Sequence, residues 1–147
     1  MKLGWMCWAP VLAIGAAAYS QAPQADPVSQ RQAMMKQFGL AMRDTAPIAM
    51  GKTPFDAATV DAKMAIVERN ATTLKTLFPT PTGAEKKTEA DPKIWQQKAE
   101  FTRRLDQLAE TAGKARTAKD AAELKESFMA IGQDCKSCHE TFRQKKG

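Results

Sequence analysis

The chain has 147 residues, a net charge of +6 and a single histidine. This length suits one domain built around one hydrophobic core. Basic residues are spread along the chain and mixed with acidic ones, and aromatic residues make up only 7%. That pattern indicates an ordinary solvated surface and argues against a nucleic-acid-binding protein.

Residues 1–20 differ in character from the rest of the chain. Lys2 is followed by an apolar run that continues to Ala18, and small residues end the segment. This pattern is typical of a secretory signal peptide that is cut near its end. A membrane anchor is the alternative, but the run is short for a membrane span and contains Pro10. We therefore expect residues 21–147 to form a secreted domain that is not attached to a membrane.

The mature sequence is patterned as four amphipathic helices and no strand. The expected helices run from about Asp26 to Arg43, from Asp56 to Phe78, from Asp91 to about Gly113, and from Asp120 to the basic C-terminus. Asp56 and Asp120 are good N-caps, and prolines follow the second helix. Each helix has one apolar stripe that it cannot bury alone. The sequence therefore predicts an all-α, antiparallel four-helix bundle.

The apolar seam of the last helix contains the chemically active residues of the chain. Its members are Leu124, Phe128, Ile131, Cys135, Cys138 and Phe142. They are separated by alternating steps of four and three, the period of helices packed nearly parallel in a bundle. We expect both cysteines to face the core, where bundles often hold cofactors.

The segment Cys135-Lys136-Ser137-Cys138-His139 has the pattern Cys-x-x-Cys-His, which is typical of covalent haem attachment. Cysteines three apart on a helix project to the same side, so both thiols can reach the two vinyl groups of one haem and form thioethers. The next residue, His139, can bind the iron from the proximal side. The sequence therefore predicts a c-type cytochrome with one covalent haem near the C-terminus.

Three other uses of these residues fit less well. A structural zinc site needs about four protein ligands, and the mature chain offers two cysteines and one histidine within five residues. A thioredoxin-like pair belongs near a βαβ pattern, which this chain lacks. A plain disulfide gives no reason for the adjacent histidine.

The sixth position of the iron is left open by these residues. With a single histidine in the chain, bis-histidine ligation within one subunit is impossible. The position is empty or holds methionine, water or a gas. Met35 follows the 4-3-4 spacing of Arg31, Met35, Phe38 and Met42, which turns it inward in the first helix. Core packing is the ordinary use of a buried methionine.

The whole mature chain resembles the cytochrome c prime family. The resemblance rests on the C-terminal haem motif with Thr141-Phe142-Arg143 after it, on Arg31-Gln32-Ala33-Met34-Met35-Lys36, on Pro54-Phe55-Asp56 and on Pro92-Lys93-Ile94-Trp95. It implies a four-helix bundle, often a homodimer, in the bacterial periplasm.

The resemblance also implies two possible iron states. Low-spin members have a methionine on the iron and transfer electrons to and from redox partner proteins. High-spin members are five-coordinate and bind nitric oxide or carbon monoxide. Met35 matches the distal position, and methionine occurs there in both kinds. We expect electron transfer with His139 and Met35 as axial ligands, with the gas-binding protein as the alternative.

Four further residues are candidates for contacting the haem. Arg31, Gln32 and Glu89 match haem-contacting positions of the family, although a carboxylate at Glu89 would repel the haem propionates and favours a backbone contact or a solvated loop. Arg143 lies one turn after His139 and is expected near the proximal face, or simply as a cation favoured at a helix C-terminus. Outside Arg31 and Gln32 the first helix offers no polar acid–base group to the distal face, and the chain has no second histidine, so an enzyme such as a peroxidase is not expected.

Overall fold

A computed structural model of the chain describes residues 26–79 and 88–144. The expected signal peptide lies outside these residues. The helices are α1 (Pro27–Ala49), α2 (Ala57–Leu74), the 3-10 turn η1 (Lys75–Leu77), α3 (Lys93–Gln96), α4 (Lys98–Arg116) and α5 (Ala121–Phe142). No helix in the described part of the chain is long and apolar enough to cross a membrane.

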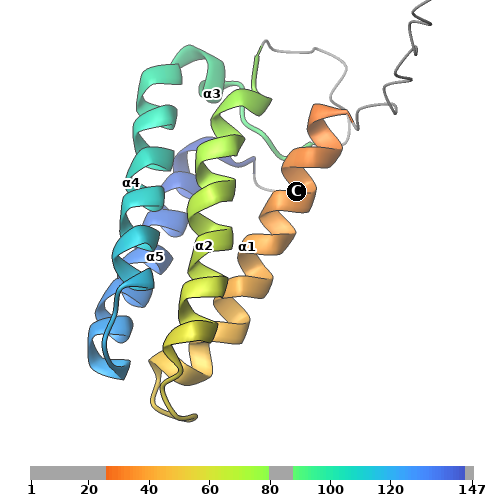
Figure 1. Cartoon of the computed structure of the whole chain (residues 1–147). Coiled ribbons are helices and arrows are strands. Elements are labelled where there is room, and N and C mark those ends of the chain that lie inside the picture. Colours follow the sequence, from red (N-terminus) through yellow and green to blue (C-terminus); the bar gives the residue numbers. More distant parts are fainter. Residues whose placement is uncertain (1–25, 80–87, 145–147) are drawn as a thin grey trace, which may run out of the picture.

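Four long helices form an antiparallel bundle, as the sequence predicted (Figure 1). α1 packs on α2 and α5, and α4 packs on α2 and α5, so each long helix has two neighbours. The short α3 lies at the end of the bundle where α4 begins (Figure 1). Within the described ranges the only β-type pairing is one isolated bridge between Ala90 and Arg143.

Aspartate side chains begin the long helices α1, α2 and α5. Asp26 accepts hydrogen bonds from the backbone of Val28 and Ser29, and Asp120 accepts from Ala122 N and Glu123 N, both at 2.9 Å. These bonds satisfy donors that the first turn of a helix cannot pair internally. The N-cap predicted at Asp120 is therefore confirmed.

Asp56 confirms the other predicted N-cap, and the second helix ends slightly earlier than expected. The Asp56 carboxylate accepts from Ala58 N at 3.1 Å. α2 then ends at Leu74, and the expected last turn is drawn into η1. Such 3-10 turns are common at the ends of α-helices.

Two boundaries differ more clearly from the expected ones. α1 continues beyond Arg43 to Ala49 with Pro47 inside its last turns. Proline costs one backbone hydrogen bond there, but Ile48 and Ala49 are buried, which offsets that loss. Gly51 then ends the turn with a φ of +66°, a conformation that favours glycine.

The expected third helix is divided into α3 and α4. The break is at Gln97, whose φ of −120° and ψ of 44° are not helical. Ile94 before the break and Phe101 after it are both buried, so the two pieces contribute to one core. The single apolar stripe expected of this helix therefore stays buried across the break, because each piece turns its apolar residue inward.

The core runs along the middle of the bundle. On α2 its members are Val60, Met64, Val67, Ala71 and Leu74. Leu124, Ile131 and Phe142 of α5 join them. The two cysteines and Phe128 are half-buried and pack against this core. Aromatic rings meet edge to face between Phe101 and Phe142, with centroids 5.3 Å apart.

Candidate functional site

A cavity of about 990 Å³ opens among α1, α4, α5 and the segment before α3. All eight residues that the sequence suggested for the site line this one cavity: Arg31, Gln32, Met35, Glu89, Cys135, Cys138, His139 and Arg143. Residues more than 100 positions apart in the chain are therefore brought together by the fold.

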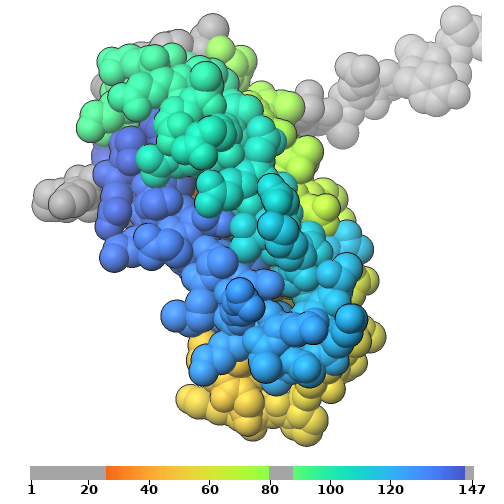
Figure 2. Space-filling view, turned by 90° about the vertical axis from the view of Figure 1, so that its left-hand side faces the viewer, coloured from red at the N-terminus to blue at the C-terminus, as the bar shows by residue number. Residues whose placement is uncertain are grey.

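α5 supplies the two cysteines and the histidine. The helix continues unbroken through the Cys-x-x-Cys-His segment to Phe142, and Arg143 N bonds to His139 O at 3.2 Å. Both thiols are free and half-buried, and the i, i+3 spacing sets them on one face of the helix. Figure 2 shows α5 beside α4 over one face of the molecule.

The surroundings keep these three groups uncharged at neutral pH. Burial raises the pKa of the Cys138 thiol to about 11, although the nearby Arg104 opposes this. Burial, followed by the charge of Asp134, also raises the pKa of Cys135. Burial and then the charge of Arg143 lower the pKa of His139, so its imidazole has a lone pair free for a metal.

α1 forms another wall of the cavity. Arg31 is only 5% exposed; its Nη1 donates to Leu77 O at 3.2 Å and its guanidinium lies 4.4 Å from the centre of the Phe78 ring. These contacts hold a buried cation in the wall. Gln32, one residue on, is exposed and also lines the cavity.

Met35 is not packed into the core. It lines the cavity and is 39% exposed, whereas Phe38 is buried and Met42 is half-buried in the same stripe. The predicted inward face of α1 is therefore correct for its other members, and the cavity leaves the Met35 thioether uncovered. This methionine is available to a group in the cavity.

Glu89 and Arg143 meet at the edge of the cavity. The Arg143 Nε donates to a Glu89 carboxylate oxygen at 2.5 Å, and Gln144 N donates to the Glu89 carbonyl at 2.7 Å. Asp91 N also bonds to Phe142 O at 2.9 Å. The segment before α3 is thus fastened to the end of α5, and the Glu89 carboxylate is ion-paired rather than solvated alone.

Sequence reasoning missed the contribution of α4. Arg104 donates from Nη1 to Ser137 O at 2.5 Å, lies over the Phe142 ring and lines the cavity. Asp134, also in the cavity wall, accepts hydrogen bonds from Gln107 and Thr111. The only sequence signal was the i, i+4 spacing of Glu100 and Arg104. This spacing indicates that the two side chains pair, but it does not show that Arg104 also bonds to Ser137 O on α5.

The residues of this cavity fit a haem. Much of the wall is apolar and comes from Phe38, Phe78, Ile94, Phe101, Leu105, Leu108 and Phe142. Two thiols on one helix face stand beside a neutral imidazole, which is the donor set for a covalently attached porphyrin. No three His, Cys, Asp or Glu residues of the described part group to hold a bare metal ion.

Known proteins resemble this chain along the described domain. The profile of the family described as Cytochrome C' matches residues 26–143. A cytochrome c' of Rhodopseudomonas palustris is 39% identical over 84% of this chain and 85% of its own length. A cytochrome c-556 of the same organism is 36% identical over 84% of this chain and 87% of its own.

A solved structure shares the same architecture. The structure of cytochrome c' from Rhodopseudomonas palustris has a TM-score of 0.76 and 38% identity, and the match covers 84% of this chain and all (100%) of that one. The profile match spans most of the chain and includes the Cys-x-x-Cys-His segment at residues 135–139. The chain therefore belongs to the cytochrome c' family of four-helix-bundle proteins that carry haem c.

Proposed function

We propose that this chain is a periplasmic electron carrier that holds one haem c through thioethers from Cys135 and Cys138, with His139 and Met35 as axial ligands. The observation that carries the proposal is that all four side chains line one cavity, three from α5 and one from α1. When bound, haem would supply an iron that exchanges one electron.

The protein residues have distinct roles in this proposal. The free cysteines fix the group covalently, and the neutral His139 imidazole is a ready ligand. Met35 is exposed within the cavity wall, so its thioether is available without unpacking the core. A soft sulfur ligand favours the reduced iron and raises the potential.

The apolar wall of the cavity and the hydrogen bonds of two arginines keep the site rigid in this proposal. Arg31 is held by Leu77 O and the Phe78 ring, and Arg104 by Ser137 O. Rigid surroundings suit electron transfer because they limit how far the site rearranges when its charge changes. We propose no enzymatic activity, since the chain has no second histidine to act as an acid or base at the distal face.

The second candidate is a five-coordinate protein that binds nitric oxide or carbon monoxide. The 39% exposure of Met35 favours it, because this side chain is not locked in place by packing. In that case Met35 covers the open face without binding the iron. The resemblance to both cytochrome c' and cytochrome c-556 relatives is compatible with either state.

Absorption spectra of the purified holoprotein separate the two. With Met35 bound, the ferric protein is expected to be low-spin with a weak sulfur-to-iron band in the far red, and the ferrous protein to resist carbon monoxide. Met35→Ala should abolish that band and open the site to carbon monoxide. Met42→Ala is the matched control, because Met42 lines the same cavity from the same helix.

Two outcomes count against the first candidate. A wild-type protein that is already high-spin and binds carbon monoxide readily puts the gas-binding function first. A protein exported in the presence of haem but without any covalently attached haem would overturn both. The homodimer that the family resemblance implies is also part of this proposal, and it is checked separately by the mass of the holoprotein in solution.

A further inference from the structure

Asp134 holds an unusual place in the cavity wall. It directly precedes Cys135 on α5, is half-buried and lines the cavity. Gln107 Nε2 donates to its Oδ1 at 2.7 Å and Thr111 Oγ1 donates to its Oδ2 at 2.9 Å. Both donors are on α4, so each carboxylate oxygen is fixed by an uncharged partner on the neighbouring helix.

Two arginines of the same wall have their charge balanced by a carboxylate. Arg104 is paired with Glu100 at 2.7 Å, and Arg143 is paired with Glu89. Asp134 differs, because no lysine, arginine or histidine among residues 26–79 and 88–144 forms an ion pair with it. Its hydrogen bonds hold the carboxylate in place and leave its negative charge uncompensated.

We propose that Asp134 sets the reduction potential of the site by holding this fixed negative charge beside the haem-attaching Cys135, which rests on the proposed function above. Oxidised iron has one more positive charge than reduced iron, so a nearby carboxylate stabilises the oxidised state more. The apolar wall strengthens the attraction, because charges interact more strongly where water is excluded. Asp134 therefore lowers the potential.

Gln107 and Thr111 are positioning residues in this arrangement. They occupy one stripe of α4, at i and i+4, and they meet Asp134 across the α4–α5 contact. Thr111 Oγ1 lies 2.9 Å from both Gln107 O and Asp134 Oδ2, so its single hydrogen is shared between an acceptor on its own helix and one on α5. Without them the carboxylate is free to turn toward water, where its charge is screened.

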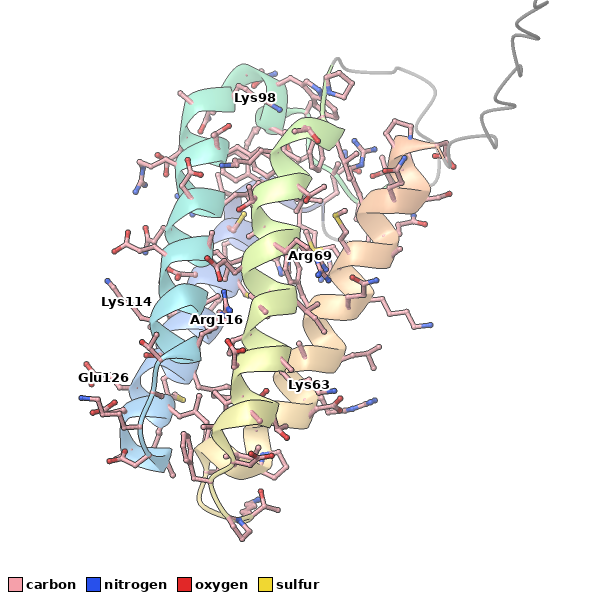
Figure 3. All side chains as sticks on the ribbon, in the orientation of Figure 1. Lys63, Arg69, Lys98, Lys114, Arg116 and Glu126 are labelled. Atoms are coloured by element: carbon pink, nitrogen blue, oxygen red, sulfur yellow. The ribbon has the colours of Figure 1, made fainter. Side chains whose placement is uncertain are left out.

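The test compares midpoint potentials of holoproteins by spectroelectrochemical titration at pH 7. Asp134→Asn keeps the size of the side chain and removes the charge, and it should shift the midpoint potential upward. Glu126→Gln is the control, because it changes the net charge equally on the same helix. Glu126 is exposed and lies toward the far end of the bundle (Figure 3), so its removal should shift the potential much less.

Two more variants separate charge from packing. Gln107→Lys places a cation against Asp134 from the exposed side of α4 and should also raise the potential, with α5 unaltered. Thr111→Val keeps the charge and removes one hydrogen bond, so it should lower the free energy of unfolding while shifting the potential less than Asp134→Asn does. Gln107→Lys keeps the proposal testable if Asp134→Asn fails to fold.

The outcomes are distinguishable. Upward shifts in Asp134→Asn and Gln107→Lys that exceed the Glu126→Gln shift support the inference. Potentials that match the control in both variants overturn it, with the proposed function intact. If the wild-type protein shows no haem spectrum, the proposed function is wrong, and the inference that rests on it is wrong as well.

Discussion

Arg104 Nη1 donates to Ser137 O at 2.5 Å, so α4 holds the backbone between the two cysteines of the Cys-x-x-Cys-His segment. Two further contacts hold the same guanidinium in place. Its Nε donates to Glu100 at 2.7 Å, and its central carbon lies 5.6 Å from the centre of the Phe142 ring. An ion pair on α4 therefore orients the arginine that fastens the attachment segment of α5.

Glu100 should make the protein more sensitive to acid. Hydrogen bonds from Arg103 and then Arg104 lower its pKa to about 2 from an ordinary 4.5. A carboxyl group with a lowered pKa adds stability above its unfolded pKa and loses it as the pH falls. Wild-type protein should therefore lose stability more steeply than Glu100→Gln between about pH 4.5 and about 2.

Urea unfolding across that pH range measures the effect. Glu126→Gln is the control, since Glu126 is an exposed carboxylate on α5 that forms no ion pair with any residue in the described ranges. Parallel pH profiles for wild type and Glu100→Gln would contradict the expectation.

Leu124 should contribute far more to stability than Met129 on the same helix. Leu124 is fully buried (0% exposed), while Met129 is 58% exposed. Leu124→Ala removes buried methyl groups and leaves a cavity, which costs about 2–5 kcal/mol. Met129→Ala should change the free energy of unfolding by less than about 0.5 kcal/mol. Equal midpoints in chemical denaturation of the two variants would show that the core is misassigned.

The pair between Glu89 and Arg143 should give a small stabilisation. Their side chains are 29% and 54% exposed, so solvent screens much of the attraction. Glu89→Gln should lower the free energy of unfolding by about 0.2–1 kcal/mol. Glu140→Gln, which removes a longer and more exposed pair with Lys136 at 3.9 Å, is expected to cost less. If Glu140→Gln loses more free energy of unfolding than Glu89→Gln does, the Glu89–Arg143 pair is not the more stabilising of the two.

Covalent attachment should require the two cysteines. The Cys135→Ala, Cys138→Ala double variant is expected to lose all of its haem on extraction with acid acetone, because no thioether then holds it. Wild-type protein should retain the haem under the same treatment. Haem that stays with the double variant would refute the assignment of these residues.

Export should remove the N-terminal segment. The intact mass of the protein recovered outside the cytoplasm is expected to equal residues 21–147 plus one haem. A mass that still includes residues 1–20 would contradict a cleaved signal peptide, while a cut a few residues away would only move the boundary.

Local spacing in the sequence was enough for the helices and for the donors on α5. N-caps at Asp56 and Asp120 are visible because a cap and its helix are adjacent in the chain. The positions of Cys135, Cys138 and His139 on one face follow from helix periodicity alone. These properties depend on neighbours within one element, and the sequence states which residues those are.

The tertiary structure alone decided how separate elements complete the site. Arg104 against Ser137, Glu89 against Arg143 and the two donors of Asp134 each join residues from different segments. Periodicity indicates which face of a helix is buried, but not which residue of another helix lies opposite, since that depends on how the helices are shifted along each other. The exposure of the Met35 thioether likewise depends on how the helices are placed, because the cavity beside it is left by the packing of α1 against α5.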